Sequence, residues 1–157
     1  MDTMNLKELP ELIENGIGMV VATRDAQLFP DVGEGSGLVL SADFQSCSVF
    51  VSSQRNKASL ANIQDNGCIA ISLSNPCTYK AAQIKGRAVK VRPMSDKEKM
   101  VSAQWLAAYR REIQLVGMMN VAAESILREP DTAVDVHIEN IYIQTPGSRA
   151  GQLMGPE

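Results

Sequence analysis

Apolar and polar positions alternate along six segments of the chain, and this alternation is typical of half-buried β-strands. The clearest cases are "IGMVVATR" and "CSVFVSS", which are rich in β-branched residues. Most of these segments follow one another without a helix between them, whereas a parallel sheet needs a helical crossover for each strand pair. The pattern therefore predicts a mainly β fold, an antiparallel barrel or sandwich with peripheral helices, with strands at 17–24, 28–41, 47–53, 67–74, 78–93 and 132–146.

Two short segments have the spacing of apolar residues that is expected for helices. The first runs from Leu6 to Gly16, where the glycine is of the type that commonly follows a helix end. Pro10 either breaks this helix or marks its first turn. The second helix is expected at 56–66, between the third and fourth strands.

A longer helix is predicted from Ser95 to about Val116. Ser95 and Glu98 have the spacing of a capping box, in which each side chain accepts a hydrogen bond from the other's backbone N–H. One apolar stripe follows, made of Val101, Trp105, Tyr109 and Val116. A further helical piece is expected at 118–129, so that residues 95–129 form a helical insertion before the last strand.

Length and composition are those of one globular domain over residues 1–157, with 45% hydrophobic and 21% charged residues. The net charge of −3 and an aromatic content of 4% give no basic surface and no stacking platform, which argues against nucleic acid as a partner. No apolar run approaches the ~20 residues of a membrane span, and the N-terminus lacks the pattern of a secretory signal. We therefore expect a cytoplasmic protein that does not bind membranes.

The residue types that most often carry catalysis or metals are sparse. Cys47, Cys68 and Cys77 form no CxxC pair and are expected to be reduced structural thiols. His137 is the only histidine and has no cysteine or histidine at ligand spacing, so no metal site is expected. No GxSxG motif supplies a nucleophile, and no catalytic residue can be assigned.

The junction between the third strand and the helix at 56–66 has an order of residues that could bind an anion. In "FVSSQRNKASLANIQDNGC" a strand ends in two hydroxyls, two cations follow, and a helix begins. Free N–H groups at a helix start, hydroxyls and cations together suit a phosphate monoester. The alternative is a solvated turn, in which Ser53 or Asn56 is only an N-cap and Arg55 and Lys57 lie in water. The local pattern leaves both interpretations open.

The order of the segments resembles that of the pyridoxamine 5′-phosphate oxidase-like, FMN-binding split-barrel family. The match covers about residues 10–93 and the closing strand at 132–146. The corresponding pieces are Ala22-Thr23, Pro30, Ser52-Ser53, Arg55-Asn56-Lys57, Asp65-Asn66 and Gly86-Arg87-Ala88.

This resemblance implies a six-stranded antiparallel split β-barrel that forms a homodimer, with FMN at the subunit interface. It implies that the FMN phosphate is held after the third strand and that the start of the fifth strand adds contacts. The flavin would lie along the second and third strands, where Gly33, Gly35 and Gly37 would permit close approach. The implied cofactor-binding residues are Ser52, Ser53, Arg55, Lys57, Thr78, Lys80 and Gln83.

The chain also departs from the family pattern. Lys80 and Ala81 stand where true pyridoxamine-phosphate oxidases carry an Arg-Gln pair, and Arg149 is the only arginine of the C-terminal tail. Oxidation of vitamin B6 is therefore not expected. The leading hypothesis is an FMN-dependent oxidoreductase with an unknown small-molecule substrate. The alternatives are a non-catalytic flavin-binding or sensing module and a split-barrel dimer that has lost its cofactor.

Overall fold

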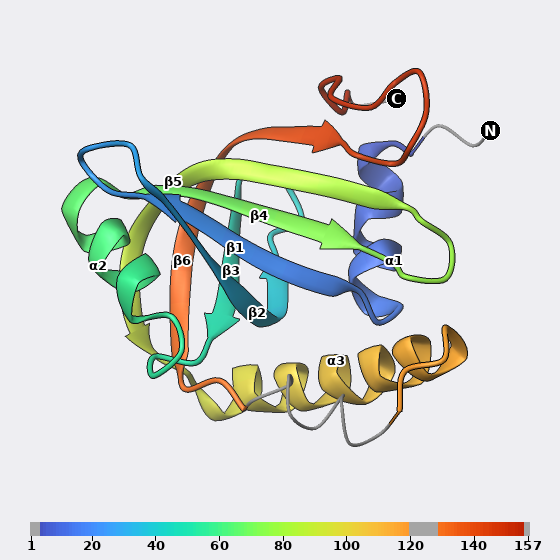
Figure 1. Ribbon diagram of the computed structural model, residues 1–157, viewed down its shortest axis with the longest axis horizontal. Coiled ribbons are helices and arrows are strands. Elements are labelled where there is room, and N and C mark those ends of the chain that lie inside the picture. Colours follow the sequence, from blue (N-terminus) through green and yellow to red (C-terminus); the bar gives the residue numbers. More distant parts are fainter. Residues whose placement is uncertain (1–3, 120–128, 156–157) are drawn as a thin grey trace.

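The computed structural model describes residues 4–119 and 129–155. Its six strands close into one antiparallel barrel in the order β1-β2-β3-β6-β5-β4 (Figure 1). The fold class predicted from the alternating pattern is confirmed, and the barrel replaces the sandwich that the pattern had left open. The strands are β1 Gly18–Arg24, β2 Pro30–Leu40, β3 Ser46–Val51, β4 Cys68–Ser74, β5 Ala81–Pro93 and β6 Thr132–Ile143.

Alternation along each strand builds the core. In β4, for example, Ile69, Ile71 and Leu73 point into the barrel and are at most 5% exposed, while the residues between them face outwards. The large fully buried side chains inside the barrel are mostly β-branched or leucine, which suits a pleated and tightly packed interior. Burial of these side chains is the main source of the free energy that holds the barrel closed.

Short helices cover the barrel at three places (Figure 1). They are the 3₁₀ helix Leu6–Glu8 followed by α1 Leu9–Glu14, α2 Lys57–Asn66 and α3 Asp96–Leu115. Pro10 lies in the first turn of α1, and Gly16 has a φ of +70°, as the sequence predicted. The helix expected at 118–129 falls largely on residues 120–128, outside the described residues.

α3 packs against β2 through one face. Trp105 is buried and its Nε1 donates a hydrogen bond of 3.0 Å to the carbonyl of Ile17, and Ser102 donates to the carbonyl of Ser36. The predicted apolar stripe is correct at Trp105 but wrong at Val116, which lies beyond the helix and is 53% exposed. Ile113 is buried in its place.

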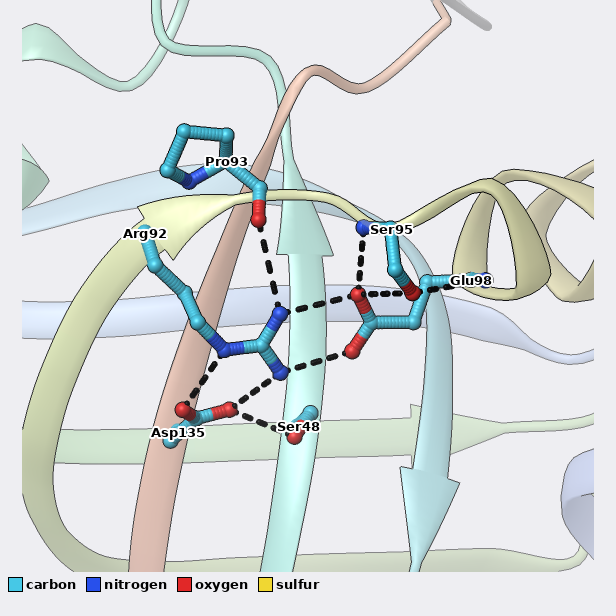
Figure 2. A network of polar contacts seen from close by, with 6 residues as sticks. All are labelled: Ser48, Arg92, Pro93, Ser95, Glu98 and Asp135. Carbon is cyan, nitrogen blue, oxygen red and sulfur yellow. Dashed lines mark hydrogen bonds and ion pairs between the residues drawn. The ribbon is translucent and has the colours of Figure 1, made fainter.

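The start of α3 is fixed to the barrel by Arg92 at the end of β5 (Figure 2). The guanidinium forms two bonds to Glu98, at 2.7 and 2.9 Å, and two bonds of 2.8 Å to Asp135 on β6. Ser95 and Glu98 form the predicted capping box. The pKa of Glu98 is lowered to about 2, mainly because Arg92 donates hydrogen bonds to its carboxylate. Hydrogen bonds from Arg92 also lower the pKa of Asp135.

The glycines of β2 make room for side chains of the protein itself. A Cβ on Gly33 would overlap Oδ1 of Asn56, and one on Gly35 would lie 2.7 Å from the side chain of Met19. Gly37 has a φ of +119° and lies against Phe50, beside the irregularity in the β2–β3 register. The chain itself occupies the side of Gly33 and Gly35 on which a Cβ would lie. That these glycines admit a flavin stays a prediction.

Candidate functional site

The segment between β3 and α2 is a tight turn built on one carbonyl. The carbonyl oxygen of Ser52 accepts hydrogen bonds from the backbone N–H groups of Arg55 and Asn56 and from Nδ2 of Asn56. This turn leaves Lys57 as the first residue of α2. The order of elements that the sequence predicted, a strand end, a turn with Ser52 and Arg55, and a helix that starts at Lys57, is therefore present.

The N-terminus of α2 has no side-chain cap. Asn56 occupies the N-cap position, but its side chain turns back and donates to the carbonyls of Ser52 and Glu34 at 3.0 and 3.4 Å. Its Oδ1 is buried against Gly33 and accepts no hydrogen bond. The first turn of α2 consequently has no side-chain cap from Asn56, and uncapped N–H groups at a helix start favour a bound anion.

Three of the four predicted residues of this turn, Ser53, Arg55 and Lys57, differ in what they contact. Nη1 of Arg55 lies 3.4 Å from Oε2 of Glu34, and both side chains are more than 40% exposed. Ser53 is held elsewhere, because its N–H and its hydroxyl donate to the two carboxylate oxygens of Asp131, at 2.8 and 2.6 Å. Lys57 is exposed and forms no ion pair within residues 4–119 and 129–155.

The second predicted group, Thr78, Lys80 and Gln83, lies at the opposite end of the barrel. β4 begins directly after α2 and ends at Ser74, which pairs with Ala81 at the start of β5 (Figure 1). Nζ of Lys80 lies 3.4 Å from Glu8, and Gln83 donates a hydrogen bond to Ser72 on the outer face of the barrel. One chain therefore does not bring the two predicted groups together.

The outer face of β1, β4 and β5 is not covered by any helix in Figure 1. Small side chains line its centre, with Ala22 of β1 paired beside Ala70 of β4. Exposed apolar residues lie at its edge towards β2: Val20 is 39% exposed and Val32 is 64% exposed. A flat face of small and apolar residues is suited to contact with another protein surface.

The remaining candidates of the sequence have ordinary surroundings. Cys47 is buried, and burial raises the pKa of its thiol to about 12. All three cysteines are free, and His137 is exposed on β6. Across residues 4–119 and 129–155, no three histidine, cysteine, aspartate or glutamate side chains gather where a metal could bind, and no helix is long and apolar enough to cross a membrane.

Sequence reasoning missed the residues that shape this site from a distance. Glu34 and Asp131 each hold a residue of the predicted anion site but lie 21 and 78 positions away from it. Asn56 was considered only as an N-cap. Its contact with Gly33 had no signal in the local pattern, although the glycine itself was a sign of a close approach.

Sequence searches against models of protein families and against curated proteins give no match. Solved structures do match in fold. HupZ of Group A Streptococcus superposes with a TM-score of 0.58 at 22% identity, covering 94% of this chain and 100% of that chain. A candidate pyridoxamine 5′-phosphate oxidase of Lactobacillus delbrueckii gives 0.54 at 19% identity, with coverages of 90% and 97%. An F420 reductase gives 0.52 at 18% identity, with coverages of 83% and 93%.

The likenesses to HupZ and to the Lactobacillus delbrueckii protein extend over at least 90% of each chain. At such low identity they concern the fold and not the activity. The chain has the split-barrel fold of the pyridoxamine 5′-phosphate oxidase-like proteins.

Proposed function

We propose that this protein binds FMN and that the phosphate of FMN is held at the start of α2. The observation that carries the proposal is the open N-terminus of α2 beside Lys57. The first-turn N–H groups, the ammonium of Lys57, the guanidinium of Arg55 and the hydroxyl of Ser52 form a donor set that matches a phosphate dianion. Ser53 is not needed in this set, since Asp131 holds its hydroxyl.

The chemistry of the donor set fits the cofactor. Arg55 is shared with Glu34, so Lys57 supplies the cation that is not already paired with a carboxylate of the described chain. The flavin supplies the redox chemistry when it is bound, and the protein binds it, orients it and limits the access of water. The F420 reductase and the candidate pyridoxamine 5′-phosphate oxidase share this fold, which supports a redox role.

A second copy of the chain would complete the cofactor site. Thr78, Lys80 and Gln83 lie too far along the barrel to act on an FMN bound at α2 of the same chain, so they would have to come from a partner. The uncovered face of β1, β4 and β5 offers a surface for such a homodimer (Figure 1). We infer a dimer in which each copy supplies one of the two groups.

The proposed dimer is tested by Val32→Lys. This substitution places a charge on the apolar edge of the uncovered face, where Val32 is 64% exposed in the single chain. Light scattering after size exclusion should then show a monomer where the wild type is a dimer, and a matched charge at the exposed Ala107 of α3 should leave the dimer intact. A wild type that is monomeric at high concentration would contradict the inference.

The activity we propose is that of an FMN-dependent oxidoreductase acting on a small molecule. The sequence holds a single histidine and no GxSxG motif, and a transfer at the flavin itself does not require an acid–base pair. A non-catalytic flavin-binding module would share the phosphate site but not the turnover. A dimer that has lost its cofactor would keep only the barrel.

Titration of the cofactor-free protein with FMN separates these three functions. We expect saturable binding with a flavin absorbance spectrum that changes on binding, and then oxidation of a nicotinamide donor in the presence of an acceptor. Binding without turnover against a panel of donors and acceptors would favour the non-catalytic module. A colourless protein that also fails to bind added FMN would refute the proposal.

A further inference from the structure

A cavity lies at the end of the barrel opposite to α2. It has a volume of about 430 Å³ and opens between the β4–β5 loop (75–80) and the C-terminal segment (144–155). Tyr79, Lys80, Ile143, Pro146, Ser148 and Arg149 line it. This volume lies in the range of sites for small organic ligands.

The cavity is cationic although the protein as a whole is acidic. Arg149 is half-buried, and its one hydrogen bond is a long one of 3.4 Å from Nε to the amide oxygen of Gln152. It forms no ion pair with any residue that the structure describes. A half-buried guanidinium without a carboxylate partner keeps most of its donors for a ligand.

Lys80 adds a second cation, and its carboxylate partner, Glu8, also accepts a hydrogen bond from the backbone. Its Nζ lies 3.4 Å from Oε1 of Glu8, while Oε2 of Glu8 accepts a hydrogen bond from the N–H of Asn5 at 2.8 Å. No carboxylate is among the residues that line the cavity. Ser148 also lines the cavity, so the polar part of the lining is suited to an oxyanion.

Both walls of the cavity are fixed in place. Asn75 is buried; its Oδ1 accepts the N–H groups of Cys77 and Thr78, and its Nδ2 donates to the carbonyl of Asn15 and to Glu112. These bonds hold a loop in which Tyr79 has a φ of +59° and is 69% exposed. Such a backbone conformation is rare for a bulky residue and is often found at ligand sites.

The C-terminal segment forms the other wall. It folds back along β6, where the N–H of Gly151 donates to the carbonyl of Ile143 at 2.7 Å and the N–H of Met154 donates to the carbonyl of Ile141 at 2.8 Å. The side chain of Met154 is buried and anchors the segment in the core. A ligand would therefore enter a preformed site and would lose little affinity to ordering of the protein.

We propose that this cavity binds a small cyclic or aromatic organic anion. Arg149 and Lys80 hold its carboxylate or phosphate, and the ring lies against Tyr79, Ile143 and Pro146. Within one chain the site lies at the opposite end of the barrel from the phosphate site at α2. The proposal does not require that the protein binds FMN, and it assigns Lys80 to this anion in place of the flavin contact that the proposed dimer would give it.

Titration of the cofactor-free protein with benzoate and with phenyl phosphate, followed by amide NMR, tests this proposal. We expect saturable shifts at Tyr79 and Arg149, and the tighter of the two probes identifies carboxylate or phosphate as the preferred group. Benzyl alcohol, which has the ring without the charge, should not saturate. Arg149→Gln should weaken binding at least about tenfold because it removes a charged hydrogen bond, and Arg149→Lys should retain part of the affinity.

Arg110→Gln is the matched control, because Arg110 is exposed on α3 and its loss changes the net charge equally. The proposal is overturned if neither probe saturates, or if Arg149→Gln and Arg110→Gln have the same effect. It is also overturned if FMN displaces the probes and Arg149→Gln weakens FMN binding as much as Lys57→Ala does. That last result would make the cavity the partner's half of the flavin site.

Discussion

The two longer helices of the protein follow similar sequences, but side chains cap the start of α3 and not the start of α2. α2 follows "SSQRN" and α3 follows "VRPMS", so a serine and a cation precede each helix. At α3 the hydroxyl of Ser95 accepts the N–H of Glu98, and Arg92 neutralises Glu98 and Asp135. At α2 the side chain of Asn56 turns away, and no side chain caps the helix.

Residue types alone therefore do not decide whether side chains cap a helix start. The α3 start is closed because a carboxylate lies in its first turn and a strand residue, Arg92, is in reach of it (Figure 2). The first turn of α2 has no acidic residue of its own, and Lys57 stands at its first position. The carboxylate of Asp31 on β2 reaches this turn and accepts a hydrogen bond of 2.6 Å from the hydroxyl of Ser59. A helix start with a positive end and an added cation is unfavourable by itself, and a bound anion would relieve it.

Arg92→Ala tests the closed start and should have the largest effect. It would leave two carboxylates facing each other without their shared cation, and the free energy of unfolding should fall by about 3 kcal/mol. This is the low end of the cost of breaking a buried pair, because all three side chains keep some contact with water. Urea denaturation followed by circular dichroism measures it.

Arg111→Ala is the control for Arg92→Ala, since Arg111 lies on α3 and forms no ion pair in the described part of the chain. Its cost should stay below about 0.5 kcal/mol, as for other surface changes. FMN affinity should be unaffected by either substitution. Equal stabilities of the two variants would contradict a structural role for the Arg92 network.

Lys57→Ala tests the open start. If Lys57 binds the phosphate, the substitution should weaken FMN binding by about 1.5–3 kcal/mol, the value of a charged hydrogen bond. The stability of the cofactor-free protein should hardly change, because Lys57 is exposed and unpaired in the described structure. Fluorescence titration with FMN provides the affinity.

Lys97→Ala provides the comparison for Lys57→Ala, because Lys97 is near the start of α3 and carries the same charge. It should leave FMN affinity as it is in the wild type. If both lysine variants bind FMN equally well, the phosphate is not held at α2.

The fold could be predicted from the sequence because its signals are local. Alternation in "GCIAISLS" placed β4 within one residue, and the capping box placed the start of α3 at Ser95. Ordering the strands into a barrel with the particular topology found here needed the resemblance, since alternation identifies the buried face of a strand but not its neighbours.

The candidate site could be predicted only in part because its shape depends on contacts between distant residues. Ser53 has the residue type of a phosphate ligand, but Asp131 reaches it from the residue before β6. The side chain of Asn56 points away from α2 because it donates a hydrogen bond to the carbonyl of Glu34 and because Gly33 has no Cβ to block it. No spacing within residues 50–68 contains this information.

Acid should reduce the stability that the start of α3 contributes more than the stability that the start of α2 contributes. Glu98 has a pKa lowered from 4.5 to about 2 and the pKa of Asp135 is lowered too, so their contribution to stability is complete above about pH 5 and is lost as pH falls towards 2. At pH 7 the wild type should have a higher free energy of unfolding than Arg92→Ala. This difference should be about 1–2 kcal/mol smaller at pH 3. Urea midpoints of both proteins at the two pH values measure this difference, and parallel curves would show that the network does not titrate as inferred.

Gly33→Ala examines why α2 is open, and its effect should be the smallest. The new methyl group would meet Oδ1 of Asn56, so one of the two must move, at a cost of about 1–2 kcal/mol. In the background of Asn56→Ala that atom is absent, and Gly33→Ala should cost about 1 kcal/mol less. A double-mutant cycle on unfolding free energies gives the coupling. Additive effects would mean that Gly33 does not position Asn56, and the open start of α2 would then rest on the hydrogen bonds of Asn56 Nδ2 alone.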